Sequence, residues 1–120
     1  MSIPLLIVDE GKGELSDLAS NLCRFHLDPN VMPYLAEDVD DALDVFNEHR
    51  GSLRLTLLDS EGQETHDALV AAGYRGRFLV YGQGKNLQKD WEDREVGFLD
   101  PSTPIEQAAG TILDKLPYFG

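Results

Sequence analysis

Apolar residues gather in five short runs along the chain. Four of these runs are apolar almost without interruption, which is typical of strands that are covered on both faces of a sheet. The remaining run contains Pro33, and because proline has no N–H to donate to a neighbouring strand, we expect this strand at an edge of the sheet. The five runs are IPLLIV (3–8), VMPYL (31–35), LRLTLL (53–58), RFLVY (77–81) and VGFL (96–99).

Between the runs, apolar residues recur at spacings of three and four, as in amphipathic helices. The last helix is the clearest, because Thr103, Pro104 and Glu106 have the pattern of a capping box with proline at the first helical position. The segment 86–95 is the weakest, since only Leu87 and Trp91 share a face, and we expect it to be the most mobile helix. The apolar stripes are Leu15, Leu18, Ala19, Leu22 and Cys23; Val39, Ala42, Leu43 and Phe46; Thr65, Ala68, Leu69 and Ala72; and Ile105, Ala108, Ala109, Ile112, Leu113 and Leu116.

Strands and helices therefore alternate along the whole chain. This alternation predicts an α/β fold, a doubly wound five-stranded parallel sheet with right-handed crossovers and helices on both faces. An edge position for the strand with Pro33 favours the strand order 2-1-3-4-5, which has its switch point between strands 1 and 3. With 120 residues, the chain is expected to form a single domain over residues 1–120.

Composition and charge narrow the range of partners. The chain carries 22 acidic and 10 basic residues, a net charge of -12 that repels phosphate backbones and anionic lipids. We therefore expect neither nucleic acid nor a membrane as a partner. Cys23 has no second cysteine to pair with and lies on an apolar helix face, so we expect it in the core. The segment MSIPLLIVDEG (1–11) lacks a basic leader and a cleavage site, which predicts a cytoplasmic location.

Acidic residues follow the two strands that should meet at the switch point. Asp9 and Glu10 come directly after the first run, and Asp59 ends the third, with Glu61 two residues further on. Ligands of doubly wound sheets bind beyond the carboxyl ends of the strands at this place. Converging carboxylates repel one another unless a cation lies between them, and Mg²⁺ favours such oxygen ligands. The alternative is that these acids only stabilise the turns that lead into the next helices.

The same stretches resemble the receiver domains of response regulators. LLIVDEG is similar to their first strand and acidic pair, YLAEDVDDALDVFNEHR to their second strand and helix, LTLLDSEG to their third strand, and FLDPSTPIEQAAGTI to their fifth strand and last helix. The resemblance implies the flavodoxin-like, CheY-like fold and a role in two-component signal transduction. It also implies that Asp59 is the phosphoacceptor, and that Asp9, Glu10, Asp59 and the backbone carbonyl of Glu61 hold Mg²⁺.

Two positions depart from the receiver pattern. Receivers have Ser or Thr at the end of strand 4, where this chain has Gly82, or Tyr81 in a register one residue earlier. Receivers also end strand 5 with Lys-Pro, and here the lysine becomes Asp100 if the prolines are matched, or Pro101 if the last helices are aligned without a gap. Loss of one charge-assisted contact to a phosphate costs ~1.5 to 3 kcal/mol. The chain thus lacks the groups that would detect a phosphoryl group.

Nearby lysines and loops offer no clear replacement. Lys12 and Lys85 could swing toward the acids, although solvated positions are the simpler expectation for both. The segment between Asp59 and Gly82 is several residues shorter than in the family and lacks the usual Pro and Asp-Gly turn. The loop that would surround an aspartyl phosphate is therefore altered as well.

Other motifs carry no chemistry of their own. GQGKN fails as a phosphate-binding loop, because Leu79 stands where the first glycine is needed and Asn86 replaces the hydroxyl residue. GKGELS has Ser16 in place of the third glycine of a dinucleotide-binding turn. The histidines are expected near helix ends or on helical surfaces, without metal-ligand spacing or a cysteine partner: His26, His49 and His66.

Three hypotheses for the function follow. The preferred one is a receiver-like, non-enzymatic signalling module that acts by protein-protein contact, with phosphorylation absent or uncoupled from its output. The second is a working phosphoacceptor that transfers a phosphoryl group to Asp59 from a histidine kinase or a small phosphodonor, with Mg²⁺. The third is an unrelated flavodoxin-like ligand-binding domain.

Receivers bind partners or dimerise through the face formed by the fourth helix, the fifth strand and the last helix. In this chain the aromatic residues on that face are candidates for contact with a signalling partner or a second copy, although burial is the simpler expectation for each. These residues are Trp91, Phe98, Tyr118 and Phe119.

Overall fold

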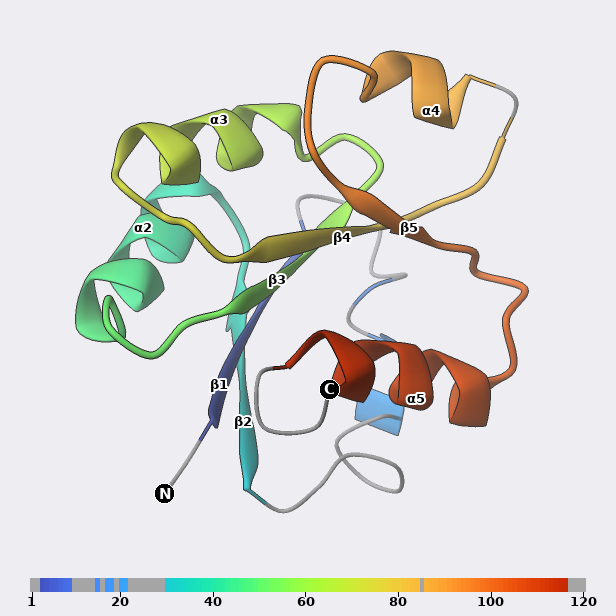
Figure 1. The fold of residues 1–120 in the computed structure, drawn as a ribbon, viewed down its shortest axis with the longest axis horizontal. Coiled ribbons are helices and arrows are strands. Elements are labelled where there is room, and N and C mark those ends of the chain that lie inside the picture. The colour runs from blue at the N-terminus through green and yellow to red at the C-terminus, as the bar shows by residue number, and fades with distance from the viewer. Residues whose placement is uncertain are drawn as a thin grey trace.

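The computed structural model describes residues 3–9, 15, 17, 18, 20, 21, 30–84 and 86–116. Strands and helices alternate along the chain (Figure 1). The elements are β1 (Ile3–Val8), β2 (Val31–Ala36), α2 (Val39–Glu48), β3 (Leu55–Asp59), α3 (Gln63–Ala71), β4 (Arg77–Tyr81), α4 (Leu87–Asp90), β5 (Gly97–Leu99) and α5 (Ile105–Lys115). Residues 15, 17, 18, 20 and 21 are also helical.

The five strands form one parallel sheet in the order β2-β1-β3-β4-β5, which confirms the predicted fold class and strand order. β2 lies at an edge, and Pro33 pairs with Leu5 of β1 in the register of the sheet. This position confirms the prediction made from proline, because the missing N–H faces no second neighbour there. The protein has a flavodoxin-like doubly wound α/β fold.

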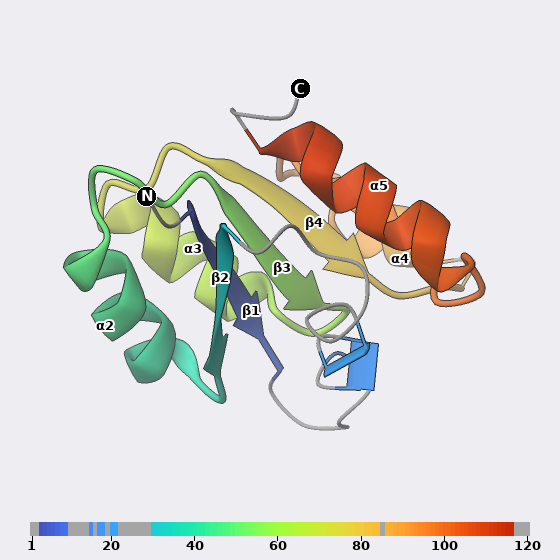
Figure 2. The same cartoon turned by 90° about the horizontal axis from the view of Figure 1, so that it is seen from below.

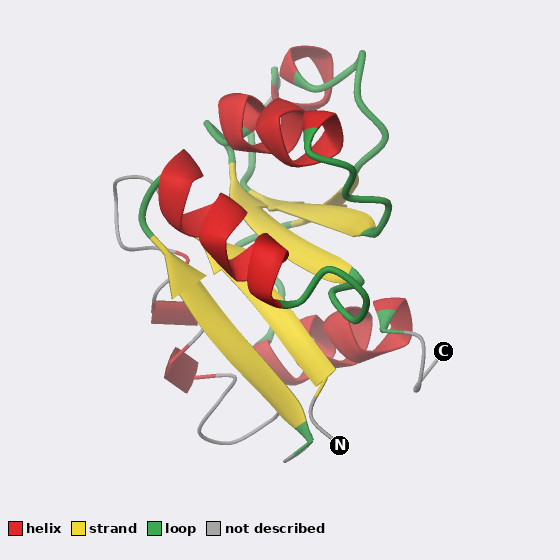
Figure 3. Cartoon of the chain, turned by 90° about the vertical axis from the view of Figure 1, so that its left-hand side faces the viewer, coloured by secondary structure: helices red, strands yellow, loops and turns green. Residues whose placement is uncertain are grey.

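Helices cover both faces of the sheet. Figure 2 shows α2 and α3 on one side and α5 on the other, and Figure 3 shows the strands between these layers. Alternate residues of a strand point to opposite faces, so both faces of a central strand must be apolar. All six residues of β1 are buried, as its uninterrupted apolar run predicts.

Each face of the sheet has its own apolar cluster. On the α5 side, Leu5, Ile7, Leu57 and Leu79 pack with the buried stripe of that helix, which includes Ile112. The cluster on the α2 and α3 side includes Leu6, Val8, Leu58 and Val80 from the strands, and Ala42, Phe46 and Leu69 from the helices. Burying one such Leu or Ile side chain contributes roughly 1.5 to 3 kcal/mol, so these two clusters dominate the stability of the fold.

Two predicted helices differ from the structure. The fourth helix extends only over Leu87–Asp90, because the backbone N–H of Trp91 bonds to the carbonyl of Gln88 and the chain then turns. The last helix begins at Ile105 with Pro104 as its N-cap, and no side chain caps it. The predicted capping box is therefore wrong. The N–H of Thr103 instead closes a turn onto the carbonyl of Asp100 at 3.0 Å.

Strand boundaries also shift slightly. β3 begins at Leu55 and includes Asp59, and β5 begins at Gly97. Leu53 precedes β3, where its N–H bonds to the carbonyl of His49 at 2.8 Å, so it closes the end of α2 while its side chain remains buried.

Within the described part of the chain, no helix has the length and apolar character needed to cross a bilayer.

Candidate functional site

The register of the sheet brings Asp9 and Asp59 to neighbouring strand ends. Val8 of β1 pairs with Leu58 of β3, and each acid is the next residue along its strand. Neighbouring strands are about 4.8 Å apart, so the backbones of Asp9 and Asp59 lie side by side at about this distance, at the carboxyl ends of β1 and β3. Both residues are half-buried. Glu10, predicted to complete the acidic pair, lies outside the described residues.

Asp59 also fixes the turn that leads into α3. Its Oδ1 accepts a hydrogen bond from the backbone N–H of Glu61 at 2.9 Å, and its carbonyl oxygen accepts one from Gly62 at 3.1 Å. Gly62 is needed here, because an added Cβ would lie 3.1 Å from the Cβ of Leu58. The turn-forming role that the sequence left open is therefore present, and it uses one of the two carboxylate oxygens.

Trp91 holds this turn from the other side. Its indole Nε1–H donates to the carbonyl oxygen of Ser60 at 3.2 Å, across 31 residues of sequence. The amide of Gln63 faces the same indole; with its oxygen turned toward the ring it accepts from Nε1 at 3.2 Å, and its nitrogen donates to the carbonyl of Glu61 at 3.2 Å. The carbonyl predicted as a metal ligand is thus within reach of a protein donor.

The burial of Trp91 bears out the simpler expectation for this residue and removes it from the candidates for partner contact. Only 1% of its surface is exposed, because the ring packs into the apolar cluster on the α3 side of the sheet. Phe98 is 36% exposed and remains a candidate for contact. Tyr118 and Phe119 lie outside the described residues.

The position that follows β4 is crowded around its Cβ in this backbone. Tyr81 pairs with Asp59, so Gly82 follows one step beyond the row of the acids. A Cβ at Gly82 would lie 3.0 Å from the Cβ of Ser60. The altered residue of the receiver pattern therefore fits the close approach of the two loops.

Asp100, at the end of β5, is used by its own loop. Its Oδ1 accepts hydrogen bonds from the backbone N–H and the hydroxyl of Ser102, both at 2.8 Å. These two bonds, the backbone one first, lower the pKa of the Asp100 carboxyl from its usual value. Asp100, one of the two positions that the receiver resemblance aligns with a lysine, therefore carries a carboxylate that is bound within its own loop.

A hollow of about 540 Å³ opens beside these strand ends. Its lining includes Ser60, Gly82 and Pro101, and Tyr81 and Thr103 also contribute to it. Gly82, Tyr81 and Pro101, three of the positions at which the chain departs from the receiver pattern, therefore border open space.

Among the described residues, no three His, Cys, Asp or Glu side chains come together as a metal site. Asp9 and Asp59 supply two carboxylates, and Glu10 lies outside the described residues. The described residues also exclude the two lysines considered as substitutes for the missing cation, Lys12 and Lys85, and they exclude Cys23 and His26.

A second polar cluster near α4 was not predicted. The guanidinium of Arg94 binds the carboxylate of Asp67 through two bonds, Nε to Oδ1 at 2.9 Å and Nη2 to Oδ2 at 2.7 Å. His66 Nδ1 lies 2.9 Å from Oδ1 of the same carboxylate. Arg94 also lies over the ring of Trp91, with its Cζ 5.8 Å from the centroid. The cluster thus ties the segment after α4 to α3.

His66 is buried, although its expected place was a helix end or a helical surface. It is 8% exposed, and its ring lies 4.3 Å from that of Phe78 and 6.0 Å from that of Trp91, centroid to centroid. The spacing of apolar residues in α3 did not predict the burial of His66, because histidine was not counted in the apolar stripe. The pairing of Arg94 with Asp67 could not be predicted either, since the two residues are far apart in sequence.

The ion pair should make stability depend on acidity at low pH. Bonds from Arg94, then from His66, lower the pKa of Asp67 to about 2. Because the folded pKa is below the unfolded one, the stabilisation is complete above about pH 4 and is lost as the pH falls toward 2. The Asp67 side chain is 55% exposed, so solvent screening limits the effect to ~0.5 to 1 kcal/mol. Urea denaturation of Asp67→Asn beside the parent should show this gap near pH 7, and its persistence unchanged near pH 2 would contradict the prediction.

No family model matches this chain, and no curated protein matches it either. The function proposed for it therefore depends on the fold and on the strand-end residues described above.

Proposed function

We propose that this protein is a receiver-like signalling module that acts by protein-protein contact, with phosphorylation absent or uncoupled from its output. The observation that carries the proposal is the set of residues at the carboxyl ends of the strands. Asp9 and Asp59 adjoin at the switch point of a 2-1-3-4-5 sheet, while Gly82 and Asp100 occupy the ends of the next two strands. Asp9 and Asp59 match two of the acids that a receiver would have, and the residues at the ends of the next strands do not match the groups that would read a bound phosphoryl group.

Physical reasoning supports the loss of coupling. A ligand shifts a conformational equilibrium only if it contacts the two conformations differently. A phosphoryl group on Asp59 would meet no hydroxyl at Gly82, and Asp100 would repel it. The indole of Trp91 also holds the turn after Asp59 through the carbonyl of Ser60. A phosphoryl group on Asp59 could bind without breaking this hydrogen bond, so the turn would keep its conformation. Phosphorylation would therefore leave the partner surface unchanged.

The partner is expected to be another signalling protein or a histidine kinase in the cytoplasm. Phe98, on β5, is exposed on the face that receivers use for such contacts. Dimerisation through α4, β5 and α5 is the alternative use of the same face.

A working phosphoacceptor is the second candidate, and the adjacency of Asp9 and Asp59 favours it. In that reaction a carboxylate oxygen of Asp59 attacks the phosphorus of the donor and an acyl phosphate forms, while the bond from phosphorus to the donor breaks, to nitrogen in a phosphohistidine or to oxygen in a small phosphodonor. With acetyl phosphate the leaving group is acetate. Asp9 and Asp59 would hold the Mg²⁺ that neutralises charge on the transferring oxygens.

Acetyl phosphate and Mg²⁺ separate these two functions. We expect intact-mass analysis to show no stable adduct of about 80 Da, or an adduct that changes neither oligomeric state nor partner affinity. Asp59→Asn is the control, because it removes the nucleophile and keeps the shape of the side chain. An adduct that depends on Asp59 and alters the oligomeric state would establish the second function.

A further inference from the structure

A group of cations lies at the end of the sheet opposite the acids. We call Arg54, Arg75, Arg77 and Lys115 the basic groove. Arg54 precedes β3, Arg75 precedes β4, Arg77 begins β4, and Lys115 ends α5. The groove thus holds four of the chain's ten basic residues, in a protein whose net charge is -12. Such concentration of positive charge is unexpected in a chain this acidic.

The four cations border two hollows that share a wall. One, of about 550 Å³, also has Glu95 in its lining, and the other, of about 490 Å³, has Asp114. Arg75, Arg77 and Lys115 line both of them. The two hollows therefore adjoin along these residues, and the cations are spread over more than one depression.

The cations of the basic groove have no acidic partner among the residues that the structure describes. The ion pairs found there involve Asp67, with Arg94 and His66, and none involves the groove. Arg54 donates to the carbonyl of Leu53 at 3.2 Å, which leaves its charge uncompensated. Their positive charge is therefore available to an anionic ligand.

The backbone that carries these cations is fixed. The buried hydroxyl of Tyr74 donates to the carbonyl of Arg77 at 2.8 Å, and the N–H of Arg77 donates to the carbonyl of Arg54 at 2.8 Å. A Cβ at Gly76 would lie 2.3 Å from the Tyr74 hydroxyl oxygen, so the turn is packed without space. Presenting charges on a rigid turn lowers the ordering cost of binding.

The arrangement favours a ligand with several separated negative charges. Arg75 and Arg77 come from one turn and Arg54 from the segment beside it, and all three are exposed, so their charges lie along an open surface and do not enclose a buried compact anion such as phosphate. A nucleic acid strand carries a dense line of charge that the acidic remainder of the protein would repel. Carboxylates spaced along a peptide match the guanidinium groups, which bind them through paired hydrogen bonds.

We propose that the basic groove binds an acidic segment of a partner protein. This site is separate from the strand-end acids, because β3 and β4, each five residues long, lie between the two ends of the sheet. At about 3.3 Å per residue, this separation is roughly 15 Å. The proposal therefore does not depend on phosphorylation of Asp59.

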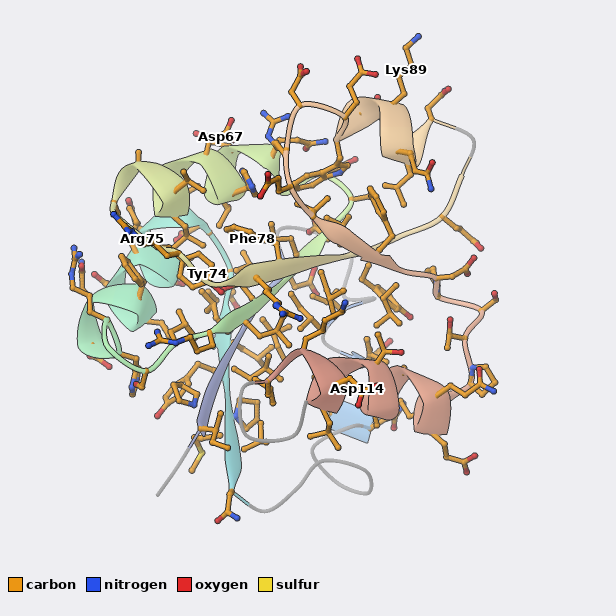
Figure 4. The ribbon with its side chains drawn as sticks, in the orientation of Figure 1. Asp67, Tyr74, Arg75, Phe78, Lys89 and Asp114 are labelled. Carbon is orange, nitrogen blue, oxygen red and sulfur yellow. The ribbon has the colours of Figure 1, made fainter. Side chains whose placement is uncertain are left out.

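Fluorescence anisotropy with a labelled peptide of alternating glutamate and serine tests the proposal. We expect binding at low salt, weakened as salt rises from about 50 to 200 mM because the contacts are between exposed charges. Arg75→Glu should weaken binding about five- to tenfold. Lys89→Glu changes the net charge equally, and Figure 4 shows Lys89 on α4, far from Arg75. This control should bind like the parent, as should Asp59→Asn.

Several outcomes would overturn the assignment. They are no binding by the parent at low salt, equal weakening by Arg75→Glu and Lys89→Glu, or stronger binding of inorganic phosphate or a single-stranded oligonucleotide than of the peptide. Self-association without peptide that Arg75→Glu abolishes would assign the groove to a second copy of the chain instead. Far-UV circular dichroism of each variant, with a melting curve, ensures that only folded proteins are compared.

Discussion

Trp91→Ala should lower the free energy of unfolding by about 3 to 5 kcal/mol, the range observed when a buried aromatic ring is removed from a core. The ring is almost fully buried and packs at right angles to His66, so its loss leaves a cavity that the short segment after α4 cannot fill. The same change releases the carbonyl of Ser60 and so loosens the turn that follows Asp59. Urea denaturation followed by far-UV circular dichroism measures the loss without needing tryptophan fluorescence.

Trp91→Phe separates packing from hydrogen bonding. It keeps most of the apolar contact but removes the indole donor. We expect the lost hydrogen bond to lower the free energy of unfolding by about 1 kcal/mol, and the smaller ring to add a packing defect to this loss. If Trp91→Ala costs less than about 1 kcal/mol, the segment that carries the ring is not packed on α3 as described.

Gly76→Ala should destabilise the fold by about 2 to 3 kcal/mol, because the added methyl group overpacks a rigid site. Its Cβ would lie 2.3 Å from the hydroxyl oxygen of Tyr74 and 2.7 Å from the carbonyl oxygen of Arg54. Moving the phenol away would break its bond to the carbonyl of Arg77. Tyr74 is buried, and this burial also raises the pKa of its phenol.

Gly110→Ala is the matched control for this substitution. Gly110 lies within α5, is exposed, and has nothing within 4 Å of an added Cβ. Alanine there should stabilise the protein by ~0.4 to 1 kcal/mol, since it restricts the unfolded chain and favours the helix. The two variants carry the same chemical change, so opposite signs in one denaturation series would isolate the effect of local space. A neutral Gly76→Ala would contradict the tight packing of the turn.

The arrangement of the strands could be predicted from sequence because it depends on strong local signals. Uninterrupted apolar runs indicate strands covered on two faces, and Pro33 restricts its own strand to an edge. Once the order of strands is known, parallel topology alone brings Asp9 beside Asp59. The turn formed by Asp59 was also foreseen, as the alternative role for that residue.

The contacts that complete the site could not be predicted in this way. The bond from Trp91 to Ser60 and the pair of Arg94 with Asp67 join residues about 30 positions apart, and no spacing rule connects them. Burial was the simpler expectation for Trp91, but its segment has few apolar neighbours in sequence, so the neighbours that it meets in space, which come from α3 and β4, could not be named. The capping box failed for a related reason, since Thr103 bonds to the preceding loop instead of the helix.

Within the described part of the chain, the strand-end acids and the basic groove lie at opposite ends of the sheet, and this separation of charge acts as a local dipole along the strands. Asp9 and Asp59 mark the negative pole, to which the acidic first turn of α2 adds, and the groove marks the positive pole. A charged protein that approaches through solution experiences a torque from such a dipole before any contact forms. Encounters will therefore be biased in orientation, and their rates should fall with rising ionic strength more than net charge alone requires.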